Sequence, residues 1–132
     1  MRLHKGQAEL MGQAMFIEKL DHAFCRDIPE FGELDADARA DFLVACLRAA
    51  NAMGLVTEQG VASYALAAWW LEIGFEDKSR YLKALFASGY PEVRKVYAMN
   101  EWAHAVIGAP DNMEAADEKL KQAFYRTQAW GR

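Results

Sequence analysis

Carboxylates and histidines at helical spacing are the residues of this sequence that could hold a metal ion. Glu101 and His104 form a Glu-x-x-His motif, whose i, i+3 spacing places both side chains on one face of a helix. Helical bundles that hold a carboxylate-bridged metal pair use two such motifs and one Glu from each of two further helices. Glu72, inside the most apolar stretch, is a further candidate ligand. Glu72, Glu101 and His104 therefore define one alternative function, a metal enzyme in a helical bundle.

The metal-site pattern is incomplete in the rest of the sequence. Glu18 and His22 are spaced by i, i+4 on one expected helix, but the last expected helix carries acids and no histidine. Exposed pairs of this kind stabilise a helix by only about 0.2–0.5 kcal/mol each, so they are common without any metal. No glycine-rich phosphate loop, G-x-S-x-G motif or paired-cysteine motif occurs. We therefore predict a protein without catalytic activity, cofactor or bound metal.

Charge is distributed unevenly along the sequence. Acids outnumber bases between Arg26 and Asp41, whereas bases outnumber acids between Lys78 and Lys95. Acids at the start of a helix interact well with the helix dipole, which is the simpler interpretation of the acidic stretch. The functional interpretation is an acidic face that steers and orients a basic partner. The residues that we predict to contact this partner are Glu30, Glu33, Asp35, Asp37 and Asp41.

Composition narrows the classes of partner. The net charge of −4 argues against nucleic acid or an anionic membrane as the main partner. The longest apolar run is too short to span a bilayer, and the first residues show no secretory signal, so we expect a cytoplasmic protein.

Cys25 and Cys46 fit no metal-binding spacing, and we expect buried free thiols. A chain of 132 residues predicts a single domain, residues 1–132.

The stretch from Thr57 to Gly74 is the most apolar part of the chain. Thr57 is a good N-cap, and Gly74 follows the last residue of the helical pattern. A helix that is apolar nearly all round is expected to be buried on most sides, so we predict a central helix with the others packed around it. Trp69 and Trp70 are consecutive, so they cannot point the same way.

The remaining helices follow from apolar residues at helical spacing and from glycine and proline at their ends. A loop over residues 28–34 buries either Phe31 or Leu34, and the sequence does not distinguish the two. No stretch alternates with a period of two, so the prediction is an all-α, single-domain bundle of about six helices. Besides the central helix, the expected helices cover residues 5–27, 35–53, 80–88, 91–108 and 111–130.

Several phrases of the sequence, taken in order, carry a family resemblance. They are K-G-Q-A-E-L-M, A-M-F-I-E-K-L-D-H-A-F, I-P-E-F, R-A-D-F-L-V-A-C-L-R-A-A, G-L-V-T-E-Q-G-V-A-S-Y and G-F-E-D. Over residues 5–77 the chain resembles small all-helical proteins encoded beside type VI secretion effectors and their spike components in Gram-negative bacteria. The most specific portion is the turn G-L-V-T-E-Q-G-V-A-S-Y, which places Gly54, Thr57, Glu58, Val61 and Tyr64.

This resemblance implies a non-enzymatic protein that binds a partner effector, and it supplies no catalytic residues to carry over. We predict an immunity protein that neutralises a secreted effector with a basic surface. An adaptor that loads the effector is the alternative within the same family. Homodimerisation through exposed aromatic side chains is a further alternative, beside the metal enzyme described above.

Overall fold

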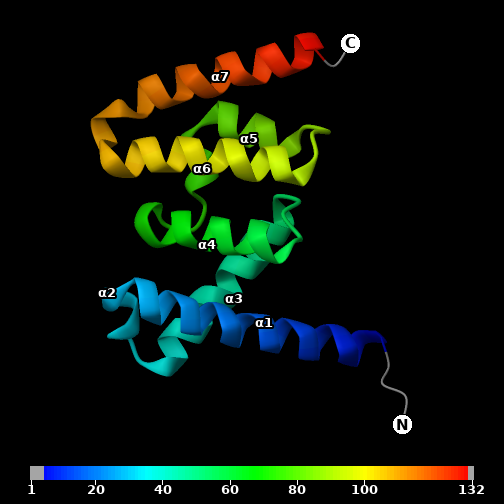
Figure 1. The fold of residues 1–132 in the computed structure, drawn as a ribbon, viewed down its shortest axis with the longest axis vertical. Coiled ribbons are helices and arrows are strands. Elements are labelled where there is room, and N and C mark those ends of the chain that lie inside the picture. The colour runs from blue at the N-terminus through cyan, green and yellow to red at the C-terminus, as the bar shows by residue number, and fades with distance from the viewer. Residues whose placement is uncertain (1–4, 131–132) are drawn as a thin grey trace. The chain divides into compact units, whose positions relative to one another are not determined.

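The computed structural model describes the backbone of residues 5–130 and the side chains of residues 12–123. Within that range the chain is almost entirely helical and contains no strand, which confirms the predicted all-α class. A one-turn helix, α2, is added inside the predicted loop. The elements are α1 (Lys5–Asp27), α2 (Pro29–Gly32), α3 (Ala36–Ala52), α4 (Glu58–Leu71), η1 (Phe75–Lys78), α5 (Arg80–Ala87), α6 (Glu92–Gly108), η2 (Pro110–Asn112) and α7 (Met113–Trp130), where η denotes a 3-10 helix (Figure 1).

The helices group into two compact units, an N-terminal unit of residues 1–47 and a C-terminal unit of residues 48–132. The boundary falls inside α3, which runs through it without a break. The prediction of a single domain over residues 1–132 stays a prediction. None of the described helices is both long enough and apolar enough to cross a membrane.

Aromatic packing forms the core of the N-terminal unit. Phe31, on α2, is completely buried, and its ring lies edge-on to Phe24 of α1 with 5.3 Å between ring centroids. A second edge contact joins Phe31 to Phe42 of α3 at 6.1 Å. Leu34 is 36% exposed, so Phe31 is the residue that packs beneath the loop. Pro29 begins α2, where its missing N–H leaves no hydrogen bond unmade.

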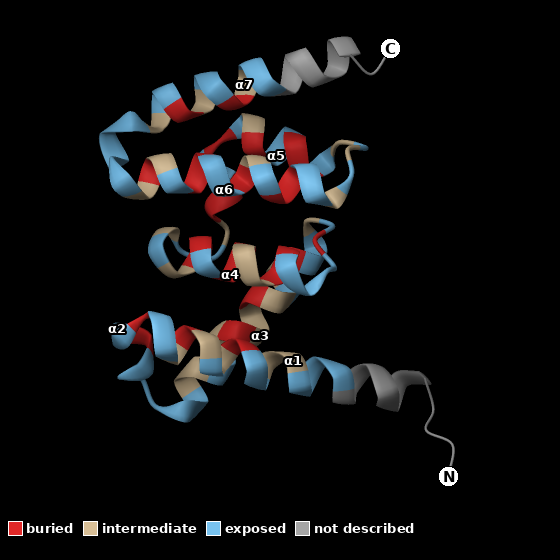
Figure 2. Ribbon diagram, in the orientation of Figure 1, coloured by how far each residue is buried: buried red, intermediate tan, exposed pale blue. Residues whose placement is uncertain are grey.

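The C-terminal unit is built on the packing of α4 against α6. Buried residues recur along α4, α5 and α6 (Figure 2). Phe75 lies between two aromatic rings, with centroids 4.8 Å from Tyr64 and 6.3 Å from Trp102. The hydroxyl of Tyr64 donates to the buried carboxylate of Glu76 at 2.8 Å and accepts from the N–H of Gly74 at 3.1 Å. Each buried polar group in this cluster therefore has a partner.

The predicted central, largely buried helix is not confirmed. Helix α4 ends at Leu71 rather than at Gly74, and Glu72 follows with a positive φ of 77°. Leu66 is 47% exposed and Trp70 is 54% exposed, whereas Trp69 is half-buried. Apart from Tyr64 and Val61, the buried residues of α4 are glycine and alanine, which allow close approach to α6, whereas Leu66 and Trp70 point outward. An apolar pattern all round a helix does not specify which side is covered.

Helices α5, α6 and α7 lie side by side, and α7 runs antiparallel to α6 (Figure 1). The buried indole N–H of Trp102, on α6, donates to Asp117 of α7 at 2.8 Å. The ammonium group of Lys95, also on α6, is buried and donates to the carbonyl of Phe86 on α5 at 3.0 Å. These two hydrogen bonds fix α6 against its neighbours.

Candidate functional site

The candidate metal ligands do not converge. Glu72 is exposed at the C-terminus of α4, and Glu101 and His104 are exposed on α6, where they line a small hollow of about 260 Å³ beside α7. Glu18 and His22 are exposed on α1. Among the residues that the structure describes, no three His, Cys, Asp or Glu side chains are grouped so that they could hold one ion. The alternative of Glu72, Glu101 and His104 as a metal site is therefore unsupported.

The two cysteines are free thiols, as predicted, but only one is fully buried. Cys46 is completely buried, and burial raises the pKa of its thiol to about 12. A thiol with that pKa is protonated at neutral pH and is a poor nucleophile. Cys25 is half-buried, and its sulfur lies 3.8 Å from a carboxylate oxygen of Asp21.

The five acids predicted to contact a partner are all exposed on α2, the following loop and the start of α3. We call Glu30, Glu33, Asp35, Asp37 and Asp41 the acidic surface. Asp35 also has a local role, because its carboxylate accepts from the N–H of Ala38 at 2.7 Å and so caps α3. Asp37 lies in the first turn of α3, where the helix dipole favours it. Glu30 lies likewise in the first turn of α2. The dipole interpretation therefore covers these three acids and does not cover Glu33 and Asp41.

Cations near the acidic surface are already occupied. Arg39 pairs with Asp21 at 2.8 Å, and it also donates to the carbonyl of Leu34 at 2.6 Å. Arg26 pairs with its neighbour Asp27 at 2.9 Å. In the described part of the chain, none of the five carboxylates of the acidic surface forms an ion pair. Their negative charge is therefore left to attract cations from outside the chain.

The basic stretch from Lys78 to Lys95 does not form a matching surface. Lys95 is buried against Phe86, and Lys83 pairs with Asp77 at 3.0 Å. The guanidinium of Arg80 lies over the ring of Tyr81 at 5.0 Å. Lys78 and Arg94 are the exceptions. Both side chains are exposed, and neither forms an ion pair with a described residue. No described residue forms a hydrogen bond with the guanidinium of Arg94, which lies on α6.

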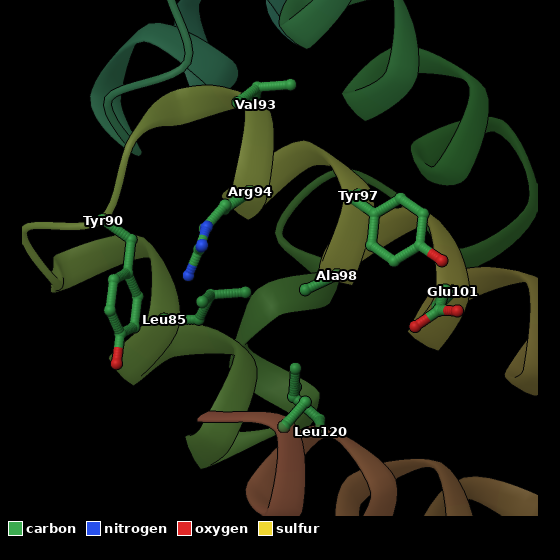
Figure 3. Close-up of a pocket in the computed structure, with 9 residues that line it drawn as sticks. Leu85, Tyr90, Val93, Arg94, Tyr97, Ala98, Glu101 and Leu120 are labelled. Carbon is green, nitrogen blue, oxygen red and sulfur yellow. The ribbon is translucent and has the colours of Figure 1, made fainter. Parts of the chain in front are cut away.

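Sequence reasoning missed a hollow of about 510 Å³ between α5, α6 and α7 (Figure 3). Its walls are mostly apolar and aromatic. The residues used below are Leu85, Tyr90, Arg94, Tyr97, Ala98, Glu101 and Leu120. The spacing of Arg94, Ala98 and Glu101 by i, i+4 and i+7 indicates one face of α6, and the small residue at its centre leaves room beside α7. This spacing was the signal in the sequence that could have indicated the hollow. It does not reveal which helices pack against this face of α6.

The protein is thus an all-helical protein with an unpaired acidic surface and a separate apolar hollow. Comparison with protein-family models, with curated proteins and with solved structures finds no match to this chain.

Proposed function

We propose that this chain is a non-catalytic protein-binding protein, an immunity protein that neutralises a type VI secretion effector in the cytoplasm of the producing cell. The main support for the proposal is that five exposed carboxylates between residues 30 and 41 form no ion pair with a described residue, although Arg39 is close enough to Asp35 to interact with it electrostatically. The resemblance over residues 5–77 supplies the class of partner. The effector presents a basic surface around its active site, and the acidic surface pairs with it and blocks access.

The mechanism follows from the electrostatics of association. Like charges concentrated on one face attract a basic partner over roughly one Debye length, about 8–10 Å at physiological salt, and orient it before contact. Leu34 is partly exposed within the acidic surface, so the contact also buries some apolar area once the two proteins meet. Charge sets the association rate, and close packing around the charged contact sets the dissociation rate.

The test measures how fast two charge-reversed variants associate with the effector that the neighbouring gene encodes. Glu33→Lys with Asp41→Lys alters the acidic surface, whereas Glu114→Lys with Glu118→Lys on α7 is the matched control. Both double variants shift the net charge from −4 by the same amount. Asp35 is left unchanged because it caps α3. We expect the first variant to associate about tenfold more slowly at low salt and the control to match the native protein.

The difference between the two variants should shrink at high salt, since exposed charges are then screened. Equal association rates for both variants would remove the acidic surface from the proposal. Co-expression with the effector separates the immunity role from the adaptor role. An immunity protein restores growth, whereas an adaptor stabilises the effector and leaves its toxicity intact.

A further inference from the structure

The hollow between α5, α6 and α7 has the size and lining of a small-molecule site. Its volume of about 510 Å³ falls within the range of about 300–1,000 Å³ that is typical of ligand pockets. Leu85 and Leu120 are both buried and form an apolar floor, and Ala98 keeps the space between them open. Ligand pockets usually combine such apolar walls with a small number of placed polar groups.

Among the described residues that line this hollow, one is a cation and one is an acid. The side chain of Arg94 extends into it between the rings of Tyr90 and Tyr97 (Figure 3). The acid, Glu101, is engaged by the hydroxyl of Tyr97, and this hydrogen bond raises the pKa of the Tyr97 hydroxyl. The guanidinium of Arg94 forms no hydrogen bond or ion pair with a described residue, so it is the polar group left to meet a ligand.

The chemistry of Arg94 selects the charge and shape of that ligand. A guanidinium carries only donors, in a planar fork that matches the two oxygens of a carboxylate. The carboxylate of Glu101, in the same lining, opposes a second negative charge on the ligand. A ligand that complements this hollow therefore has one anionic head group and an apolar body.

We propose that the hollow binds a small amphipathic monocarboxylate. Its carboxylate pairs with Arg94, and its hydrocarbon body lies along Leu85, Ala98 and Leu120. The lining described by the structure holds no histidine, cysteine or serine, and the proposal is for binding alone. The proposal does not depend on the acidic surface, whose residues belong to the N-terminal unit, while the hollow lies within the C-terminal unit.

The test uses the full-length chain and decanoate as the probe, with methyl decanoate and decylamine as matched ligands that lack the negative charge. Isothermal titration gives the affinities, and methyl NMR signals of Leu85 and Leu120 report the place of binding. We expect decanoate to bind at micromolar to millimolar concentration and to shift these signals. Methyl decanoate should bind about tenfold more weakly or not at all, because it carries no charge to pair with a guanidinium. Decylamine can pair only with Glu101, so any binding of decylamine should not depend on Arg94.

Three variants locate the interaction. Arg94→Met keeps the apolar stem and should weaken decanoate binding about tenfold. Ala98→Leu fills the hollow without removing a core side chain and should abolish binding. Lys78→Met, an exposed cation outside the lining, is the control and should bind as the native protein does. Far-UV circular dichroism checks that each variant is folded.

Several results would overturn the proposal. They are an absence of decanoate binding, equal affinity for decanoate and its methyl ester, unchanged affinity in folded Arg94→Met, and NMR shifts confined to residues outside the hollow. None of these results bears on association with the effector, so the failure of this proposal is distinct from a failure of the immunity function.

Discussion

At the scale of a single residue, the backbone conformation of Glu72 is a feature that the sequence pattern does not predict. It is the one non-glycine residue with positive φ in the described chain, with φ of 77° and ψ of 153°. This region of backbone space is populated almost entirely by glycine. The reason lies in tertiary packing: the chain must reverse soon after Leu71 so that Phe75 enters the core and Gly74 reaches the hydroxyl of Tyr64. The sequence predicted that the helix ends with a glycine cap at Gly74, and Gly74 does have a positive φ of 90°. It did not predict the strained backbone at Glu72, two residues earlier.

Glu72→Gly should therefore stabilise the protein. Relief of strain at such a position is about 1–3 kcal/mol, and the extra entropy of an unfolded glycine offsets about 0.5–1 kcal/mol of it. We expect a net gain of about 1 kcal/mol in the free energy of unfolding, measured by urea denaturation. Glu72→Ala is the control, because alanine keeps the Cβ that causes the strain and should give no gain. A destabilised Glu72→Gly variant would show that the backbone here is not strained.

Residue types predicted part of the candidate sites and missed the rest for a physical reason. The exposure of the five acids and the capping role of Asp35 follow from local sequence, because helix starts favour acids. The hollow does not follow from local sequence, since Leu85, Arg94 and Leu120 come from three helices and meet only through packing. In the sequence Arg94 is simply one member of a basic stretch.

At the scale of elements, the cap shared by α4 and α6 is another contact that local sequence does not predict. Thr57 was predicted as the N-cap of α4, and its hydroxyl does accept from the N–H of Gly60 at 2.9 Å. The carboxylate of Glu92, at the start of α6, also accepts from the N–H groups of Val56 and Thr57 at 2.9 and 3.0 Å and from the Thr57 hydroxyl. The start of α4 was predictable because its first cap depends on neighbours in sequence. This second cap was not, because it depends on how α4 and α6 pack.

Gly60→Ala tests this shared cap. Alanine in a helix is ordinarily favoured over glycine by about 1 kcal/mol, but a Cβ at Gly60 would lie 2.5 Å from a carboxylate oxygen of Glu92 and 3.0 Å from the Thr57 hydroxyl oxygen. The carboxylate must then shift, which disturbs its hydrogen bonds with Thr57. We expect Gly60→Ala to lower the free energy of unfolding by about 1–2 kcal/mol at pH 7. In a Glu92→Ala background the same change should become neutral or stabilising, and a double-mutant cycle measures the reversal.

The cap also has a predicted pH dependence. Desolvation opposes ionisation of Glu92, but the hydrogen bonds from Thr57 and Val56 outweigh it and hold its pKa below the ordinary value of 4.5. A carboxylate with a lowered pKa contributes stability above its unfolded pKa and loses it as the pH falls through the folded value. The penalty of Gly60→Ala should therefore be full at pH 7 and shrink as the pH falls below 4.5. A penalty that does not change with pH would exclude Glu92 as its cause.

At the scale of the whole molecule, the two units differ in how many of their described apolar residues are buried. The described core residues of the N-terminal unit are Leu20, Phe24, Ile28, Phe31, Leu43 and Cys46, whereas the other buried apolar residues all belong to the C-terminal unit. The sequence predicted one domain because no linker separates the two units. The boundary lies within the continuous helix α3, and a helix leaves no compositional mark of a boundary.

We predict that the N-terminal unit unfolds first. Its 1–47 range is close to the lower limit of about 40 residues for independent folding, so it has little stability to lose. All four tryptophans lie within residues 48–132, so intrinsic fluorescence reports the C-terminal unit, whereas far-UV circular dichroism reports helices of both. The circular dichroism midpoint in urea should therefore precede the fluorescence midpoint. Phe42→Trp adds a fluorescent reporter to the N-terminal unit, and its extra signal should follow the earlier transition. Coincident curves from all probes would instead establish the single cooperative domain that the sequence predicts.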